Sequence, residues 1–290
     1  MKNTGKSAQT GKSQLRLTLR LFRRNKLAMV GTGIVLFMIL MAVFANLIAP
    51  YDPNYADISM RLQFPSAAHW FGTDNFGRDL LTRIIYGARI SLMVSLMGLL
   101  ISLLIGGALG AIAGYFGGIS DNIIMRAMDI LMSIPGMLMS ISISALLGLG
   151  VVNTAIAVSI GGIAPSARLL RSSVMTVRSQ EFVEAARAQG SGHLRVIIRQ
   201  ILPNTLSPII VDSTLRIGMN ILQISMLSFI GLGVQSPTPE WGSIMNTGRD
   251  FISSFYPMLV FPGIFILLTM FGFNVMGDGL RDALDPKMKD

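Results

Sequence analysis

Charged side chains inside apolar stretches are the first candidates for chemistry in this sequence. Asp212 and Arg216 lie four residues apart, in the order that favours an ion pair on one face of a helix. Arg126 and Asp129 lie three residues apart in another apolar stretch. If these stretches cross a bilayer, such charges are unstable facing lipid, so we expect all four to face the interior of a helix bundle.

Two interpretations of Asp212 and Arg216 stay open. We favour a mutual structural pair inside the bundle, because neighbouring opposite charges satisfy each other first. Alternatively, the two groups line a water-filled path, where they would meet the charged ends of a zwitterionic substrate. The same two interpretations apply to Arg126 and Asp129, which lie nearer the cytoplasmic side. There the two residues could also contact the polar segment 181–203.

Covalent and metal chemistry have few residues to use. The chain has no cysteine, and its two histidines, His69 and His193, are far apart in the sequence. A Gly-Lys-Ser sequence near the N-terminus occurs twice, but neither copy has the glycine spacing of a phosphate-binding loop. No Gly-x-Ser-x-Gly elbow is present, which disfavours a membrane-embedded hydrolase. We therefore expect no catalytic residue, no metal and no cofactor bound by this chain.

The composition is that of a membrane protein. Of the 290 residues 51% are hydrophobic and only 13% are charged, and the mean hydropathy is +0.59. This leaves too little polar surface to close a soluble globule. The apolar stretches predict an all-α, polytopic membrane protein. Its six predicted transmembrane helices cover residues 27–49, 90–115, 120–147, 151–175, 205–233 and 256–277.

The net charge of +9 indicates orientation in a membrane rather than a nucleic-acid surface, because the basic residues lie next to the apolar spans. Their bias predicts that both termini are cytoplasmic, with residues 176–203 inside and residues 50–86 and 234–255 outside. The predicted divisions of the chain are a basic cytoplasmic tail over 1–26, a six-helix transmembrane domain over 27–280 and a cytoplasmic tail over 281–290.

Small residues and one proline indicate how the spans pack. Gly106, Gly110 and Gly114 fall four residues apart on one face, where a neighbouring helix can approach backbone to backbone. Pro135 should bend the third span, because it removes a backbone donor and collides with the preceding turn. The bend either lines a path that opens and closes or is a static kink.

The segment 71–79, with the sequence FGTDNFGRD, has turn and cap residues. Thr73 or Asp74 should cap the helix that becomes the second span, and Gly77 should allow a close backbone approach. The side-chain oxygens invite a calcium-site interpretation, but the spacing of an EF-hand loop is absent.

A polar helical segment, residues 181–203, lies between the fourth and fifth predicted spans. Its two adjacent alanines would give a helix a smooth face that another protein can approach, whereas a lipid anchor would need bulky apolar residues there. Within this helix Glu184 can pair with Arg187. Gly190 should end the helix, and a second short helix should follow over 193–200. The candidate contact residues are Glu184, Ala185, Ala186, Gly190, Leu202 and Pro203.

Five long motifs are spread over nearly the whole chain. They are GTDNFGRDLLTRIIYGARISL at 72–92, AGYFGGISDNIIMRAMDILMSIP at 113–135, EAARAQG with RQILPN within 184–204, LSFIGLGVQSPTPEWG at 227–242 and FNVMGDGLRDALDPK at 273–287. Together they resemble the motifs of one family, the dipeptide, oligopeptide and nickel ABC importer permeases. Within that family the chain is similar to the second of the two permease subunits, as its ending DALDPK and compact first external loop suggest.

The resemblance implies a type I ABC importer permease fold in the bacterial inner membrane and a set of partners. These are a second homologous permease subunit, two ATP-binding subunits that bind and hydrolyse the ATP, and an extracytoplasmic solute-binding protein, all in contact with membrane lipid. The segment 181–203 would then be the coupling region that contacts an ATP-binding subunit.

The substrate that the resemblance implies is a dipeptide or short oligopeptide, with glutathione or a nickel chelate as alternatives. A different class, an ion-coupled secondary transporter, would use Asp129 and Asp212 as membrane carboxylates. It would not need the segment 181–203, and no inverted repeat is visible.

Overall fold

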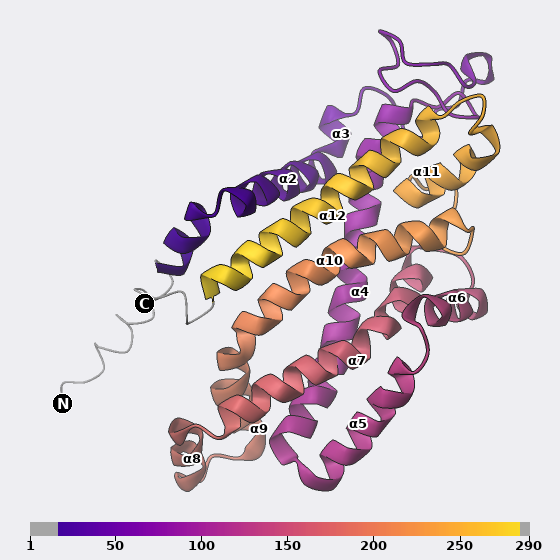
Figure 1. Ribbon diagram of the computed structural model, residues 1–290. Helices are drawn as coiled ribbons and strands as arrows, with labels where there is room; N and C mark the ends of the chain where they lie inside the picture. The colour runs from indigo at the N-terminus through magenta and orange to yellow at the C-terminus, as the bar shows by residue number, and fades with distance from the viewer. Residues whose placement is uncertain (1–16, 285–290) are drawn as a thin grey trace.

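The computed structural model describes residues 17–284, which are almost entirely helical and contain no β-strand (Figure 1). The predicted tail residues 1–16 and 285–290 lie outside the described residues, whereas 17–24 are helical and precede the first long helix. The helices are α2 (Lys26–Val43), α3 (Ala45–Ile48), α4 (Leu80–Phe116), α5 (Gly118–Met132), α6 (Gly136–Leu147), α7 (Val151–Arg178), α8 (Glu181–Ala188), α9 (His193–Val196), α10 (Leu206–Phe229), α11 (Trp241–Gly248) and α12 (Pro257–Leu284).

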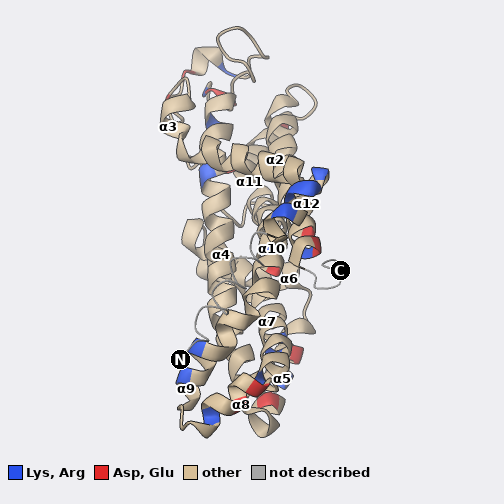
Figure 2. Ribbon diagram, turned by 90° about the vertical axis from the view of Figure 1, so that its left-hand side faces the viewer, with Lys and Arg blue, Asp and Glu red and all other residues tan. Residues whose placement is uncertain are grey.

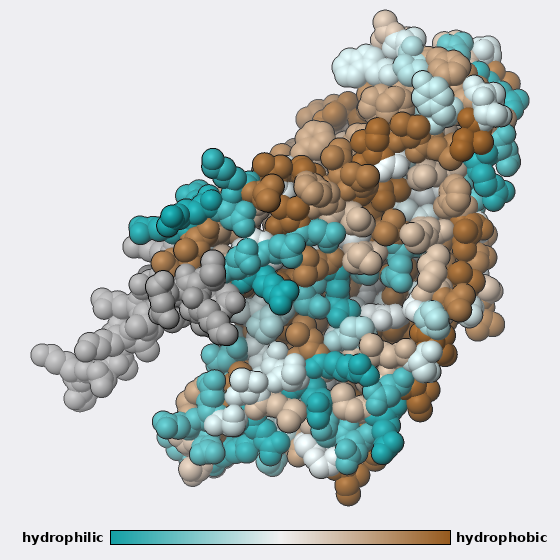
Figure 3. All heavy atoms as spheres, in the orientation of Figure 1, coloured by the Kyte–Doolittle hydropathy of each residue, from teal (hydrophilic) through white to brown (hydrophobic). Residues whose placement is uncertain are grey.

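The long helices run alternately up and down the bundle, so that the first and last described helices begin and end on the same side (Figure 1). Four continuous helical stretches are long and apolar enough to span a membrane, and the bent pair α5 and α6 makes a fifth. The fourth predicted span, residues 151–175, corresponds to α7, which is 28 residues long but less apolar because it carries several arginines. Apolar side chains cover much of the middle of the surface in Figure 3, and hydrophilic ones gather toward its two ends.

The predicted glycine face on α4 is confirmed, and its partner is α7. A Cβ added to Gly106 or Gly110 would lie 2.2 Å from a backbone carbonyl oxygen of α7, and one added to Gly114 would lie 2.7 Å from another. Only glycine therefore permits this backbone-to-backbone contact, which is the most extensive helix pairing in the described chain.

The third predicted span is two helices, not one bent helix. The axes of α5 and α6 differ by 85°, and the break falls at residues 133–135. Pro135 is the N-cap of α6, because its ring cannot continue α5 and it has no N–H to donate. The prediction of a bend at this proline is confirmed, but the observed break is sharper than a kink.

The segment 230–256 is not a simple external loop. It contains α11, whose Trp241 is fully buried and donates its indole N–H to the carbonyl oxygen of Ile84 on α4 at 3.0 Å. Gly87 makes room for this ring, since a Cβ there would lie 2.8 Å from the indole. The short helix thus wedges against α4, α10 and α12 and helps to close that end of the bundle.

The segment 71–79 caps α4, although not through the residues predicted. Asp79, rather than Thr73 or Asp74, is the N-cap, and its carboxylate accepts from the backbone N–H of Thr82 at 2.7 Å. Asp74 instead folds the preceding turn: it accepts from the side chain of Arg78 at 2.7 Å and from two backbone N–H groups. The sequence could not separate these carboxylates, because all of these residues suit a helix cap or a turn.

Gly77 provides the close approach that was predicted. Its φ of +75° suits glycine, and a Cβ would lie 1.7 Å from the carbonyl oxygen of Asp57. Hydrogen bonds from the side chain and backbone of Ser59 lower the pKa of the Asp57 carboxyl below its ordinary value. Because Gly77 lies against the carbonyl group of Asp57, the turn 57–60 and the turn 71–79 are in direct contact at this end of the bundle.

Candidate functional site

Helix α8 forms a projecting knob at the end of the bundle where α7 finishes and α9 begins (Figure 1). Its inner side is fixed by Val183, which is fully buried in a cluster with Tyr115 of α4 and Val177 of α7. Glu184 and Ala185 are exposed, whereas Ala186 is half-buried. The smooth face available to a partner therefore centres on Ala185. The sequence suggested that the two alanines are equivalent, and they are not.

The pairing of Glu184 with Arg187 is not formed among the described residues. The guanidinium of Arg187 lies instead over the ring of Tyr115, 4.8 Å from its centroid. The Tyr115 hydroxyl is in turn 2.9 Å from Nδ1 of His193 at the start of α9. A cation over an aromatic face gains more than an exposed surface ion pair does, so Arg187 ties α8 to α4 and Glu184 stays free in solvent.

The end of α8 is defined by glycine, as predicted. Gly190 has φ +78°, its N–H donates to Arg187 O at 2.9 Å, and the N–H of Ser191 donates to Ala186 O at 3.1 Å. These two bonds are those of the Schellman motif, which satisfies the last carbonyls of a helix. The α8 knob thus has a fixed length and ends in a defined turn.

The second predicted helix, 193–200, is present, but only its first turn, α9, is α-helical. A π-helical turn over Ile197–Ile201 and a 3₁₀ turn over Leu202–Thr205 follow and lead into α10. Leu202 packs against the same apolar cluster as Val183, whereas Pro203 is exposed. Both ends of the segment are therefore anchored on one cluster, which makes it a compact unit at the end of α7 and α10.

The charged pair on α10 is present. Arg216 Nε contacts the carboxylate of Asp212, and its terminal nitrogen donates to the carbonyl oxygen of Gly162 on α7 at 3.3 Å. The side chain of Arg216 is 18% exposed and that of Asp212 is 32% exposed, so the pair is partly accessible on the single subunit rather than enclosed in its core. This position suits both open interpretations, and the role of the pair stays a prediction.

Asp129 does not pair with Arg126, and its partner is Arg168 on α7. Among residues 17–284 no ion pair of Arg126 is found. An arginine that precedes an acid by three residues on a helix has the less favourable order, and the neighbouring helix offers a better-placed cation. A second pair missed from the sequence links the same helices: Arg171 donates to both carboxylate oxygens of Asp121.

These two cross-helix pairs hold α5 against α7 below the break at 133–135. The two acids and the two arginines were visible in the sequence. Which acid meets which arginine depends on the antiparallel packing of α5 and α7, which the sequence does not show. Figure 2 shows charged residues on α5, α8 and α9 and at the end of α12, while most of the α4 ribbon is uncharged. Charged residues therefore gather at the end that carries the α8 knob, and Figure 2 shows a further group at the opposite end, around α3.

One buried acid was also missed. Glu240, fully buried, caps α11 by accepting from the backbone N–H of Ser243 at 2.9 Å, and its other oxygen is 3.2 Å from the hydroxyl of Ser91 and 3.3 Å from that of Ser225. It therefore joins α4, α10 and α11 through one carboxylate. The sequence analysis placed this residue in an external loop, and no pattern around it indicated burial.

Comparisons with known proteins agree with this architecture. Residues 106–290 match the family described as binding-protein-dependent transport system inner membrane component, and residues 13–65 match the N-terminal transmembrane domain of oligopeptide transport permease C. Solved structures of the MetNI methionine ABC transporter in an inward-facing conformation align with a TM-score of 0.55, covering 70% of this chain and 97% of theirs at 16% identity, which shows a shared fold.

Two curated relatives cover almost the whole chain. The dipeptide transport system permease protein DppC of Alkalihalophilus pseudofirmus is 48% identical over 97% of this chain and 92% of its own length. The glutathione transport system permease protein GsiD of Escherichia coli is 45% identical over 93% of this chain and 89% of its own length.

The helical bundle with its projecting α8 knob is the membrane-spanning subunit of an ABC importer. More specifically, the chain belongs to the binding-protein-dependent transport system inner membrane component family, among the permeases of its peptide branch. It is therefore a multi-pass component of the membrane, and the ion-coupled alternative is left without support.

Proposed function

We propose that this chain forms half of the import path for dipeptides or short oligopeptides and that α8 transmits the motion of an ATP-binding subunit. The other half would come from a second homologous permease, and an extracytoplasmic binding protein would deliver the solute. In this arrangement the α8 knob and both termini lie in the cytoplasm. ATP is bound and hydrolysed by the partner subunits.

The observation that carries the proposal is the construction of α8. Its inner face is locked by Val183 and by Arg187 over Tyr115, while Glu184 and Ala185 are exposed. A helix held this firmly moves together with α4 and α7 when a partner pushes it. Its outer surface is small enough at Ala185 for a groove of another protein to approach closely.

The proposal is tested by placing a charge on the exposed alanine. In the reconstituted transporter with its partner subunits, Ala185→Asp should reduce solute uptake by about tenfold or more, because an unpaired charge in a protein interface costs about 2–5 kcal/mol. ATP hydrolysis should continue without driving uptake. The matched control is Ala56→Asp, an exposed alanine at the opposite end of the bundle. Uptake equal to that of the unmodified transporter would refute the coupling role of α8.

Glutathione is the second candidate substrate, and the observation that favours it is the 45% identity to a glutathione permease. Both candidates are small peptides with charged ends, so Asp212 and Arg216 would suit either one if they line the path. Calorimetry of the cognate binding protein with dipeptides and with glutathione separates the two. Retention of glutathione alone would exclude the dipeptide assignment.

A further inference from the structure

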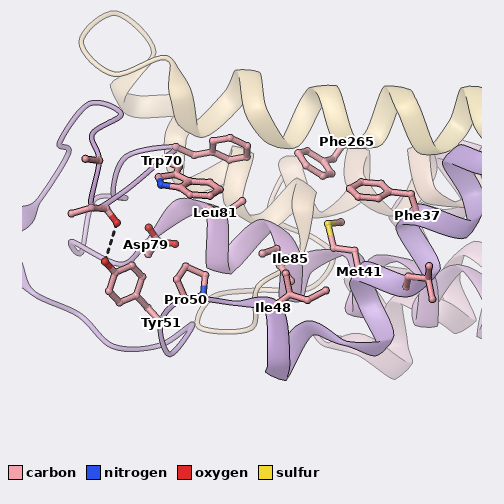
Figure 4. Close-up of a pocket in the computed structure, with 14 residues that line it drawn as sticks. Phe37, Met41, Ile48, Pro50, Tyr51, Trp70, Asp79, Leu81, Ile85 and Phe265 are labelled. Atoms are coloured by element: carbon pink, nitrogen blue, oxygen red, sulfur yellow. Dashed lines mark hydrogen bonds between the residues drawn. The ribbon is translucent and has the colours of Figure 1, made fainter.

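An apolar groove of about 740 Å³ opens beside α2 and α3, at the end of the bundle that carries the segment 50–79. This volume is within the range of about 300–1,000 Å³ that is usual for small-molecule sites. Figure 4 shows Phe37, Met41 and Phe265 toward one end of it and Tyr51 and Asp79 toward the other. The groove therefore has an apolar end among the spans and a more polar end beside the connecting segment.

The polar groups at that second end are already engaged. Asp79 caps α4 and also lies 2.9 Å from Nδ1 of His69, and the Tyr51 hydroxyl donates to the carbonyl oxygen of Ala68 at 2.9 Å. Within residues 17–284, no lysine or arginine lines the groove. The site therefore has no free cation for a phosphate or a carboxylate, and its complementarity is to an apolar chain.

The groove is continuous with an exposed apolar face of α2 and α3. Phe37 is 57% exposed and Ile48 is 51% exposed, and they line the groove beside Leu47, which is 83% exposed and outside it. Trp70 and Tyr51 stand at the polar end of the groove, and exposed Trp and Tyr are typical of the level where acyl chains give way to head groups. The groove thus runs from that level into the adjacent leaflet.

We propose that this groove holds an acyl chain of a phospholipid from that leaflet, with its head group left outside. The side chains that line an apolar groove without water lack dispersion contacts on the side that faces the groove. An acyl chain that enters the groove supplies these contacts. Since lipid tails are as apolar as the groove, retention depends on shape and packing rather than on a hydrophobic driving force. The proposal rests on the membrane placement of the chain and not on the substrate or on coupling to ATP.

The test uses the complete transporter in nanodiscs that contain a phospholipid with a photoreactive diazirine in its acyl chain. After illumination, peptide mass spectrometry should find adducts on groove residues such as Phe37, Ile48 and Leu81 several-fold above those on Leu104 and Leu267, which are exposed outside it. Phosphatidylethanolamine and phosphatidylglycerol probes should label the groove equally.

Filling the groove with Ala68→Phe should remove this excess, whereas Ala56→Phe, in the same connecting segment but outside the groove, should leave it unchanged. Ala67→Phe is a second filling variant, and assembly of the complex is checked by gel filtration. Labelling spread evenly over Leu104, Leu267 and the groove would overturn the proposal. So would crosslinks from a photoreactive residue at position 37 to the partner permease, because a protein segment would then occupy the groove; neither result would affect the proposed transport function.

Discussion

Replacing Gly110 by alanine should separate the two helices at the centre of the bundle. An added Cβ would lie 2.9 Å from the Cα of Ala167 and only 2.2 Å from its carbonyl oxygen, well inside the 3.0 Å that real Cβ contacts respect. Relief to an ordinary 3.4 Å contact requires α4 and α7 to move apart by about 1 Å here, and such overpacking costs about 1–3 kcal/mol. The displaced atom is backbone, so no rotamer change can absorb it.

The matched control is Gly33→Ala on α2, where an added Cβ meets nothing within 4 Å. Alanine favours a helix over glycine by about 1 kcal/mol, so this variant should be neutral or slightly more stable. Gly110→Ala carries the same helix gain, and any loss it shows is therefore due to the contact with α7.

The assay is thermal unfolding of the purified protein followed by tryptophan fluorescence, where about 2–4 °C corresponds to each kcal/mol in chains of 150–250 residues. We expect Gly110→Ala to lower the midpoint by several degrees relative to Gly33→Ala. Equal midpoints for the two variants would refute the reasoning, because the 2.2 Å approach would then carry no energetic cost.

Three further predictions concern charge and orientation. Asp212→Asn or Arg216→Gln alone should impair assembly of the complex more than the double variant does, since an unpaired charge within a span costs on the order of 3 kcal/mol. If the double variant assembles but does not transport, the pair belongs to the path and not only to the structure. Arg171→Gln should loosen α5 from α7 by removing the two bonds to Asp121, and a crosslink between cysteines placed on these helices should become less efficient, whereas unchanged efficiency would mean that apolar packing alone holds α5. Because the chain has no cysteine, Ser66→Cys should react with an impermeant thiol reagent in intact cells and Ser191→Cys should not; the opposite pattern would invert the orientation.

The sequence predicted those features that depend on one residue type and its neighbours. The glycine face on α4, the end of α8 at Gly190 and the break at Pro135 all follow from local sterics, and all three are observed. What it could not predict is which partner each feature meets. The 85° between α5 and α6 depends on how α6 packs against α7, which no local pattern specifies.

Tertiary competition accounts for the wrong predictions. Arg187 had a glutamate three residues before it, but the ring of Tyr115 was brought closer by folding. Asp129 had Arg126 on its own helix, but it pairs with Arg168 on α7 instead. In each case a local rule worth a few tenths of a kcal/mol gave way to a contact between elements.

The central claim, that the exposed face of α8 contacts an ATP-binding subunit, is tested most directly by crosslinking. In the assembled transporter, Ala185→Cys should form a crosslink of short span with a single cysteine in the groove of the ATP-binding subunit, and the yield should change when ATP binds. Ala56→Cys, at the opposite end of the bundle, should give none. Absence of any crosslink from position 185 in a complex that still transports would contradict the account.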